Sequence, residues 1–120
     1  MIAWIVSITS NIFLIINLTI SLKKAIIHGS IYEIGTVVVT EMSGIEKKFG
    51  KIIRIWTNEG QIHFEFEEFE EFTYDDHYRA YIVEETGVYK SIMHRDLPNI
   101  PPCLSIIENN THFMHTHFKL

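Results

Sequence analysis

The stretch FGKIIRIWTNEGQIHFEFE, residues 49–67, decides the fold class. Its two halves are rich in β-branched and aromatic residues, and they flank an Asn-Glu-Gly turn at 58–60. Glycine there permits the positive φ that a tight hairpin needs. In the second half, apolar residues at 62, 64 and 66 alternate with polar ones. This alternation predicts an antiparallel hairpin with one buried face and one wet, acidic face.

The first half of the hairpin follows the same logic. We expect Ile53 and Ile55 to point to the core, while Arg54 and Trp56 share the opposite face. Arg54 then lies close enough to pair with an acid on the facing arm.

Outward from the hairpin, short apolar runs alternate with turn residues, as in an all-β domain. They predict strands at 25–28, 35–41, 78–83, 88–92, 104–107 and 112–118, with a turn at Gly87 and one helical turn at 94–97. This pattern suggests a mainly β fold, a small SH3-like barrel over residues 23–120.

The N-terminal segment, residues 1–22, differs from the rest. Between 2 and 22 there is no charge, and fourteen of the twenty-one residues are apolar, among them Ile2, Trp4, Phe13 and Leu22. A helix of about twenty such residues spans a bilayer. We therefore expect one N-terminal apolar helix followed by the barrel domain.

Three interpretations of this segment stay open. It is a membrane anchor, a buried or oligomerising helix, or sequence upstream of the true domain start with no selected role. As an anchor, the segment with Lys23 and Lys24 behind it would place the barrel in the cytoplasm by the positive-inside rule. Otherwise the chain is soluble inside the cell.

Composition narrows the function classes. The 120 residues carry a formal charge of −5, and seven of the fifteen acids lie between 65 and 76. A nucleic-acid binder shows the opposite, a basic face, so we expect no direct nucleic-acid binding. No phosphate loop or nucleophile motif is present in the sequence. We expect neither an enzyme nor a cofactor.

The runs HGSIYEIGTVVV (28–39), FGKIIRI (49–55), HYRAYIV (77–83) and LPNIPP (97–102) resemble a β-rich module of uncharacterised transposon-derived animal proteins. The chain is also distantly similar to BAH-type chromatin modules. The resemblance covers about residues 24–120 and implies an SH3/BAH-like fold. Such modules usually end longer chains whose upstream part binds DNA.

The acidic run has two interpretations, a solvated charged face or a surface for a basic partner peptide. Exposed charge runs are commonly the former. The candidate partner-binding residues are Trp56, Glu65, Glu67, Glu70, Glu71, Tyr74, Asp75 and Asp76. A sharper hypothesis joins Trp56, Tyr74, Tyr78 and Tyr81 in an aromatic cage for methyl-lysine.

The C-terminal histidines and the single cysteine are further candidates for chemistry. His115 and His117 share a strand face, but a metal needs three or four converging ligands, so we expect no metal site. Cys103 is the only cysteine and reads as a small, partly buried thiol.

The leading hypothesis is a non-enzymatic protein-interaction module, derived from a mobile-element protein, that binds an unknown protein through its acidic and aromatic face. The alternative is a single-pass membrane protein that displays a cytoplasmic β domain.

Overall fold

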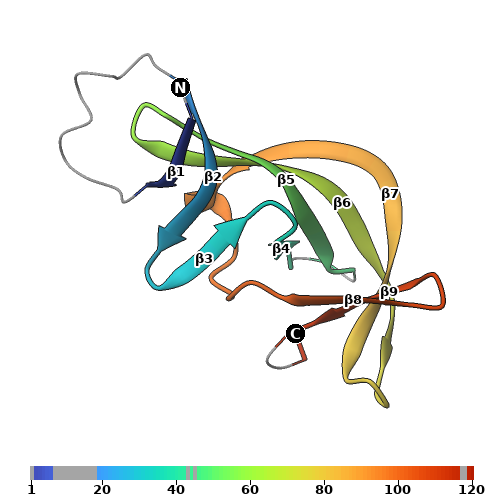
Figure 1. Cartoon of the computed structure of the whole chain (residues 1–120). Coiled ribbons are helices and arrows are strands. Elements are labelled where there is room, and N and C mark those ends of the chain that lie inside the picture. Colours follow the sequence, from blue (N-terminus) through green and yellow to red (C-terminus); the bar gives the residue numbers. More distant parts are fainter. Residues whose placement is uncertain (1, 7–18, 43, 45, 117–118) are drawn as a thin grey trace.

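The computed structural model describes residues 2–6, 19–42, 44, 46–116 and 119–120, which form one curled, open sheet (Figure 1). The strands run in the order β1-β2-β5-β6-β7-β9-β8, with β3 paired to β2 and β4 paired to β5. A bridge between Val37 and Cys103 draws β4 toward the start of β8. The mainly β class is therefore confirmed, as a half-barrel. The strands are β1 (Ile2–Val6), β2 (Thr19–Ile27), β3 (Ser30–Glu33), β4 (Val37–Glu41), β5 (Lys48–Asn58), β6 (Gln61–Asp75), β7 (Ala80–Met93), β8 (Leu104–Glu108) and β9 (Thr111–His115).

The β5–β6 hairpin confirms the prediction from residues 49–67. Glu59 and Gly60 both have positive φ, 51° and 77°, as a two-residue hairpin turn requires. From the pair Asn58–Gln61, the ladder runs back to Lys48 opposite Glu70. The apolar face is also as expected, because residues 62, 64 and 66 are all buried.

The side-chain prediction for the first arm is wrong at Ile53. A bulge between Ile52 and Arg54 adds one residue to β5, and the extra residue reverses the alternation upstream of it. Ile52 and Ile55 are consequently fully buried, while Ile53 is exposed. The predicted ion pair does form, since Arg54 Nε lies 3.4 Å from Glu65 Oε1.

The prediction of a turn at Gly87 is wrong. Residues 80–93 form one long strand, and Gly87, with φ of 74°, sits in a bulge where the register jumps between Glu67–Tyr89 and Phe69–Glu85. The positive φ that suggested a turn serves a bulge instead. A short 3-10 helix, η2 (His94–Asp96), and a β8–β9 hairpin with positive φ at Asn109 and Asn110 follow as expected.

The bulge wraps around Glu68, a buried carboxylate in the middle of β6 with only 4% of its surface exposed. Its Oε1 lies 3.2 Å from Lys90 Nζ of β7 and 3.7 Å from Lys48 Nζ of β5. Thr86 Oγ1, in the bulge, donates to Oε2 at 3.2 Å. A single side chain thus ties together the three long strands.

The N-terminal helix expected over residues 1–22 is not supported. Ile2–Val6 is a strand that pairs in parallel with β2, and β2 itself begins at Thr19 and pairs with β5. Leu22 lies in the core, so the expected boundary at Lys23 falls inside β2. The physical reason is the abundance of Ile, Val and Thr, which favour strands once an edge is there to pair with.

Phe13 lies outside the described residues, as do the others from 7 to 18. Within the part of the chain that the structure describes, there is no helix with the length and hydrophobicity of a bilayer span.

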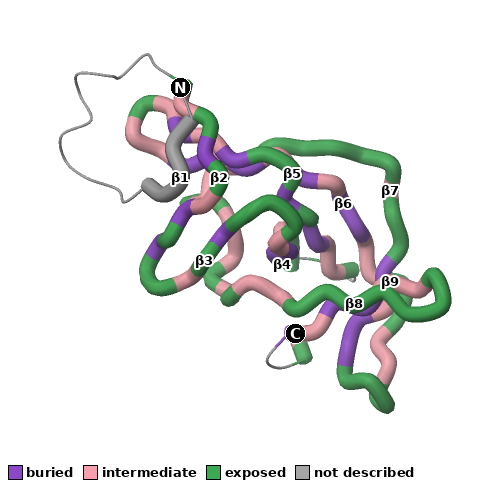
Figure 2. The backbone as a smooth tube through the Cα atoms, in the orientation of Figure 1, coloured by how far each residue is buried: buried purple, intermediate pink, exposed green. Residues whose placement is uncertain are grey.

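The core consists of two clusters of buried residues, and Figure 2 marks the buried positions in purple along the strands. One gathers around Ile52, Ile55 and Phe64, and the other around Phe49, Phe69 and Tyr81. Between them Gly50 lets the ring of Phe66 lie directly on the β5 backbone. A Cβ atom at Gly50 would lie 2.5 Å from Phe66 Cδ2 and 2.9 Å from Thr40 Cγ2.

We predict that Gly50→Ala lowers the free energy of unfolding by about 2 kcal/mol, because Phe66 and Thr40 must move to admit one methyl group. Urea unfolding followed by tryptophan fluorescence measures the change. The matched control is Lys51→Ala on the exposed face of the same strand, which should stay within about 0.5 kcal/mol of the parent. Equal stability of the two variants would show that the Gly50–Phe66 contact is not tight.

Candidate functional site

The candidate partner-binding residues lie along β5, β6 and the turn after β6, and they do not form one surface. Trp56 stands at the β5–β6 turn end, where its ring stacks on His63 at 5.3 Å and Arg54 lies 4.5 Å above it. Tyr74 stands at the other end of β6, opposite Tyr81 in the ladder. The aromatic cage therefore does not assemble from Trp56 and Tyr74.

The two acids nearest the β5–β6 turn have basic neighbours within the sheet. Glu65 pairs with Arg54, and Glu67 lies directly opposite Lys51 in the β5–β6 ladder. Charge on this half of the face is largely compensated by the chain itself.

The other half contains a row of charges that crosses four strands, here named the acidic row: Glu41, Lys48, Glu70 and Glu84. Each member is the direct ladder partner of the next. Lys48 Nζ lies 3.5 Å from Glu41 and 3.7 Å from Glu68, and these two carboxylates, Glu68 first, raise the pKa of Lys48. Lys48 is thus already shared between Glu41 and Glu68. The last two members of the row, Glu70 and Glu84, are like charges directly opposite each other in the ladder.

The remaining acids of the set hold local structure. Glu71 accepts a hydrogen bond from the Lys47 amide at 3.3 Å. Asp75 Oδ1 accepts from the amides of His77 and Tyr78 at 2.8 and 3.0 Å, which fixes the turn after β6. Asp76, next in that turn, is exposed.

The aromatic side chains at this end pack on one another. Tyr74 meets the ring of Tyr81 edge-on at 4.9 Å and lies under Lys119 Nζ at 4.5 Å. Tyr81 is buried, and Tyr78 packs on Phe113. These rings are part of the core and its edge.

Of the two histidines weighed as metal ligands, His115 ends β9 and His117 lies outside the described residues. No group of three His, Cys, Asp or Glu side chains placed to hold a metal occurs among the residues described.

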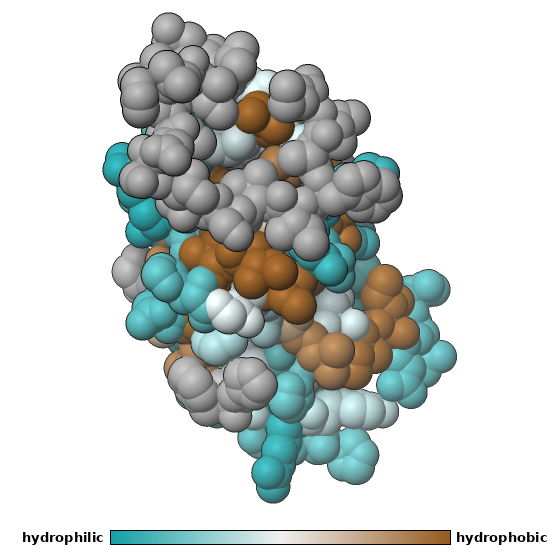
Figure 3. Space-filling view, turned by 60° about the vertical axis from the view of Figure 1, so that its left-hand side comes forward, coloured by the Kyte–Doolittle hydropathy of each residue, from teal (hydrophilic) through white to brown (hydrophobic). Residues whose placement is uncertain are grey.

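Some apolar side chains are exposed, and Figure 3 shows a face of the molecule on which they gather. Ile26 and Ile31 face each other across β2 and β3, and both are more than 40% exposed. The edge strand β8 exposes Leu104, Ile106 and Ile107.

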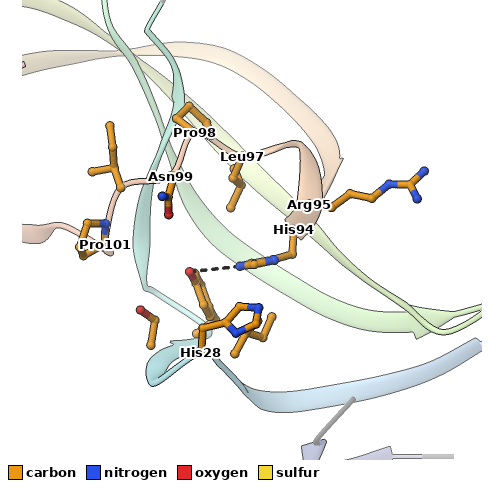
Figure 4. A pocket seen from close by; sticks show the side chains of 11 residues that line it. His28, His94, Arg95, Leu97, Pro98, Asn99 and Pro101 are labelled. Atoms are coloured by element: carbon orange, nitrogen blue, oxygen red, sulfur yellow. Dashed lines mark hydrogen bonds between the residues drawn. The ribbon is translucent and has the colours of Figure 1, made fainter. Parts of the chain in front are cut away.

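A pocket of about 410 Å³, which the sequence did not predict, opens between the β2–β3 turn and the segment from η2 to the prolines (Figure 4). Leu97 and Asn99 point from that segment toward the middle of the pocket, while the Arg95 side chain extends outward. The lining residues are Ile27, His28, Ser30, Tyr32, His94, Arg95, Leu97, Pro98, Asn99, Ile100 and Pro101.

The polar end of the pocket is a pair from distant parts of the chain. His94 Nε2 and Tyr32 Oη share a hydrogen bond of 3.3 Å. Burial raises the pKa of Tyr32, so its phenol stays protonated. Burial, and then the nearby His28, lower the pKa of His94 below its usual value. Both groups are therefore neutral at pH 7, and one hydrogen bond joins them.

No single sequence pattern marks this pocket, because its two walls are 62 residues apart at the Tyr32–His94 contact. The one local hint was the rigid run of prolines after η2, which cannot join a sheet interior.

Cys103 lies beside β4 through its bridge to Val37, and burial raises the pKa of its thiol to about 11. A nucleophilic cysteine needs a lowered pKa.

We predict that Ellman's reagent at about pH 8 modifies Cys103 in the native protein about 100-fold more slowly than in the urea-unfolded protein, because a pKa raised by two units lowers the thiolate fraction by that factor. Equal rates in the two states would show that the thiol is neither buried nor raised in pKa.

Comparisons of the chain with models of protein families, with curated proteins and with solved structures find no match. The site must therefore be interpreted from its own geometry.

Proposed function

We propose that this chain is a non-enzymatic protein-interaction module of SH3-like type that binds a basic segment of a partner protein at the acidic row. The observation that carries the proposal is the direct ladder pairing of Glu70 with Glu84. The bent β5–β6–β7 meander supports the SH3-like assignment (Figure 1). The raised pKa of Cys103, the opposite of an activated thiol, supports a binding role.

The charges of the acidic row alternate in sign from Glu41 to Glu70, and the alternation ends at Glu84. Like charges directly opposite in a sheet destabilise it by about 0.5 kcal/mol. Among the residues that the structure describes, the carboxylates of Glu41, Glu68, Glu70 and Glu84 face two ammonium groups, Lys48 and Lys90. A positive side chain supplied from outside, placed between Glu70 and Glu84, would complete the alternation.

The surface also suits a guanidinium or ammonium group sterically. Glu84 is exposed and Glu70 is half-buried, so both carboxylates are accessible. Two neighbouring carboxylates match the forked donors of arginine, whose charge-assisted hydrogen bonds are roughly twice as strong as neutral ones. The partner is accordingly a basic peptide segment with arginine favoured over lysine.

We predict that a fluorescein-labelled hexa-arginine peptide binds the full chain and that Glu84→Lys weakens binding at least about tenfold, because it places a competing ammonium group beside Glu70. Fluorescence anisotropy at low salt measures the affinity. The melting temperature of Glu84→Lys should be unchanged or slightly higher than that of the parent, since the substitution removes the like-charge pair.

The matched control is Glu59→Lys at the β5–β6 turn, which changes the net charge equally and lies on an exposed loop. It should weaken binding by less than about threefold, through long-range attraction only. If the two variants weaken binding equally, the peptide responds to net charge alone and the proposal of a defined site fails.

A further inference from the structure

The pocket between the β2–β3 turn and residues 94–101 is lined by basic and uncharged side chains, in a chain whose net charge is negative. The chain carries −5, yet the lining contains His28, His94 and Arg95 and neither an Asp nor a Glu. A concave, partly apolar site lined by groups of one sign concentrates ligands of the other sign.

Several polar side chains line the polar end of the pocket. Burial, and then the nearby His28, lower the pKa of His94, so the two imidazoles lie close enough to interact. Ser30 hydrogen-bonds the Tyr32 phenol. The Asn99 side chain points into the pocket from the segment that follows η2 (Figure 4). A negative charge beside the imidazoles would favour the protonated form of His94 and would accept hydrogen bonds from the donors around it.

The rest of the lining is apolar and stiff. Ile27, Leu97, Ile100 and two proline rings form it, so a bound apolar group would cost little side-chain ordering. The volume of about 410 Å³ is at the lower end of small-ligand pockets. It admits one ring or branched chain beside a charged group.

We propose that this pocket binds a small organic carboxylate, with the carboxylate between His28 and His94 and the apolar body against Leu97 and Pro101. The site is separate from the acidic row and does not depend on the proposed function. Phosphate offers the charge without an apolar body, and a neutral amide offers the body without charge. Neither matches both ends of the pocket.

Binding is expected to strengthen as the pH falls. The titratable or charged groups around His94 are Tyr32 from β3, His28 from the β2–β3 turn, and Arg95 and Asp96 from its own helix, while β6 faces it with the uncharged ring of Phe64. A carboxylate beside His94 stabilises the protonated form of this imidazole, so its affinity rises as the pH drops toward the lowered pKa of His94.

The test is a two-dimensional NMR titration of the full chain with benzoate, benzamide and inorganic phosphate, at about pH 5.5 and about pH 7.5. We expect saturable shifts at the pocket with benzoate, at least about tenfold weaker binding of benzamide and phosphate, and tighter benzoate binding at the lower pH. Equal affinity for benzamide, equal affinity for phosphate, pH-independent binding, or no saturation would each overturn the proposal.

Two variants locate the site. His28→Asn keeps the left-handed backbone that residue 28 adopts (φ 49°), because asparagine tolerates it, and should weaken benzoate binding by about fivefold. His77→Gln, an exposed histidine in the turn after β6, is the control and should leave the affinity unchanged. Equal effects of both would place binding outside the pocket.

Discussion

The buried carboxylate of Glu68 links the three long strands on which the rest of the sheet is built. A charge out of water is costly unless it is paired and hydrogen-bonded. Its partners come from both neighbouring strands, Lys48 from β5 and Lys90 and Thr86 from β7. The three strands must therefore meet at one point, and β7 must bulge at Gly87 to bring Thr86 there. Because Lys48 is also shared with Glu41, the same constraint leaves Glu70 and Glu84 without enough positive charge.

Local patterns predicted what depends on neighbours in sequence. The β5–β6 and β8–β9 hairpins, the η2 turn and the Arg54–Glu65 pair followed from alternation and turn residues. What could not be predicted is the effect of extra residues in a ladder, one at Ile53 in β5 and two around Gly87 in β7. The bulges at Ile53 and Gly87 leave no mark in alternation, because a bulge is defined by the partner strand that it opposes.

The strands of the N-terminal segment and the pocket were not predicted from the sequence, for a related reason. Hydropathy predicted a helix, whereas β1 pairs with β2, and β2 pairs with β5, whose residues lie more than thirty positions further along the chain. The candidate acids and the pairing of Arg54 with one of them were predicted, but the compensation by Lys51 and the Lys47 amide was not. Likewise the pocket joins Tyr32 to His94 only after the sheet has curled. Tertiary pairing, rather than composition, decides each of these features.

The central claim is that Glu68 ties the long strands together, and a double-mutant cycle between Glu68 and Lys90 tests it most directly. Urea unfolding of Glu68→Gln, Lys90→Met and the double variant measures the coupling free energy. Lys90 is half-exposed, which screens the pair, so the account predicts a coupling of about 1 kcal/mol. The exposed Arg54–Glu65 pair, measured with Arg54→Met and Glu65→Gln, should give about 0.3 kcal/mol. A Glu68–Lys90 coupling no larger than that of Arg54–Glu65 would contradict the account.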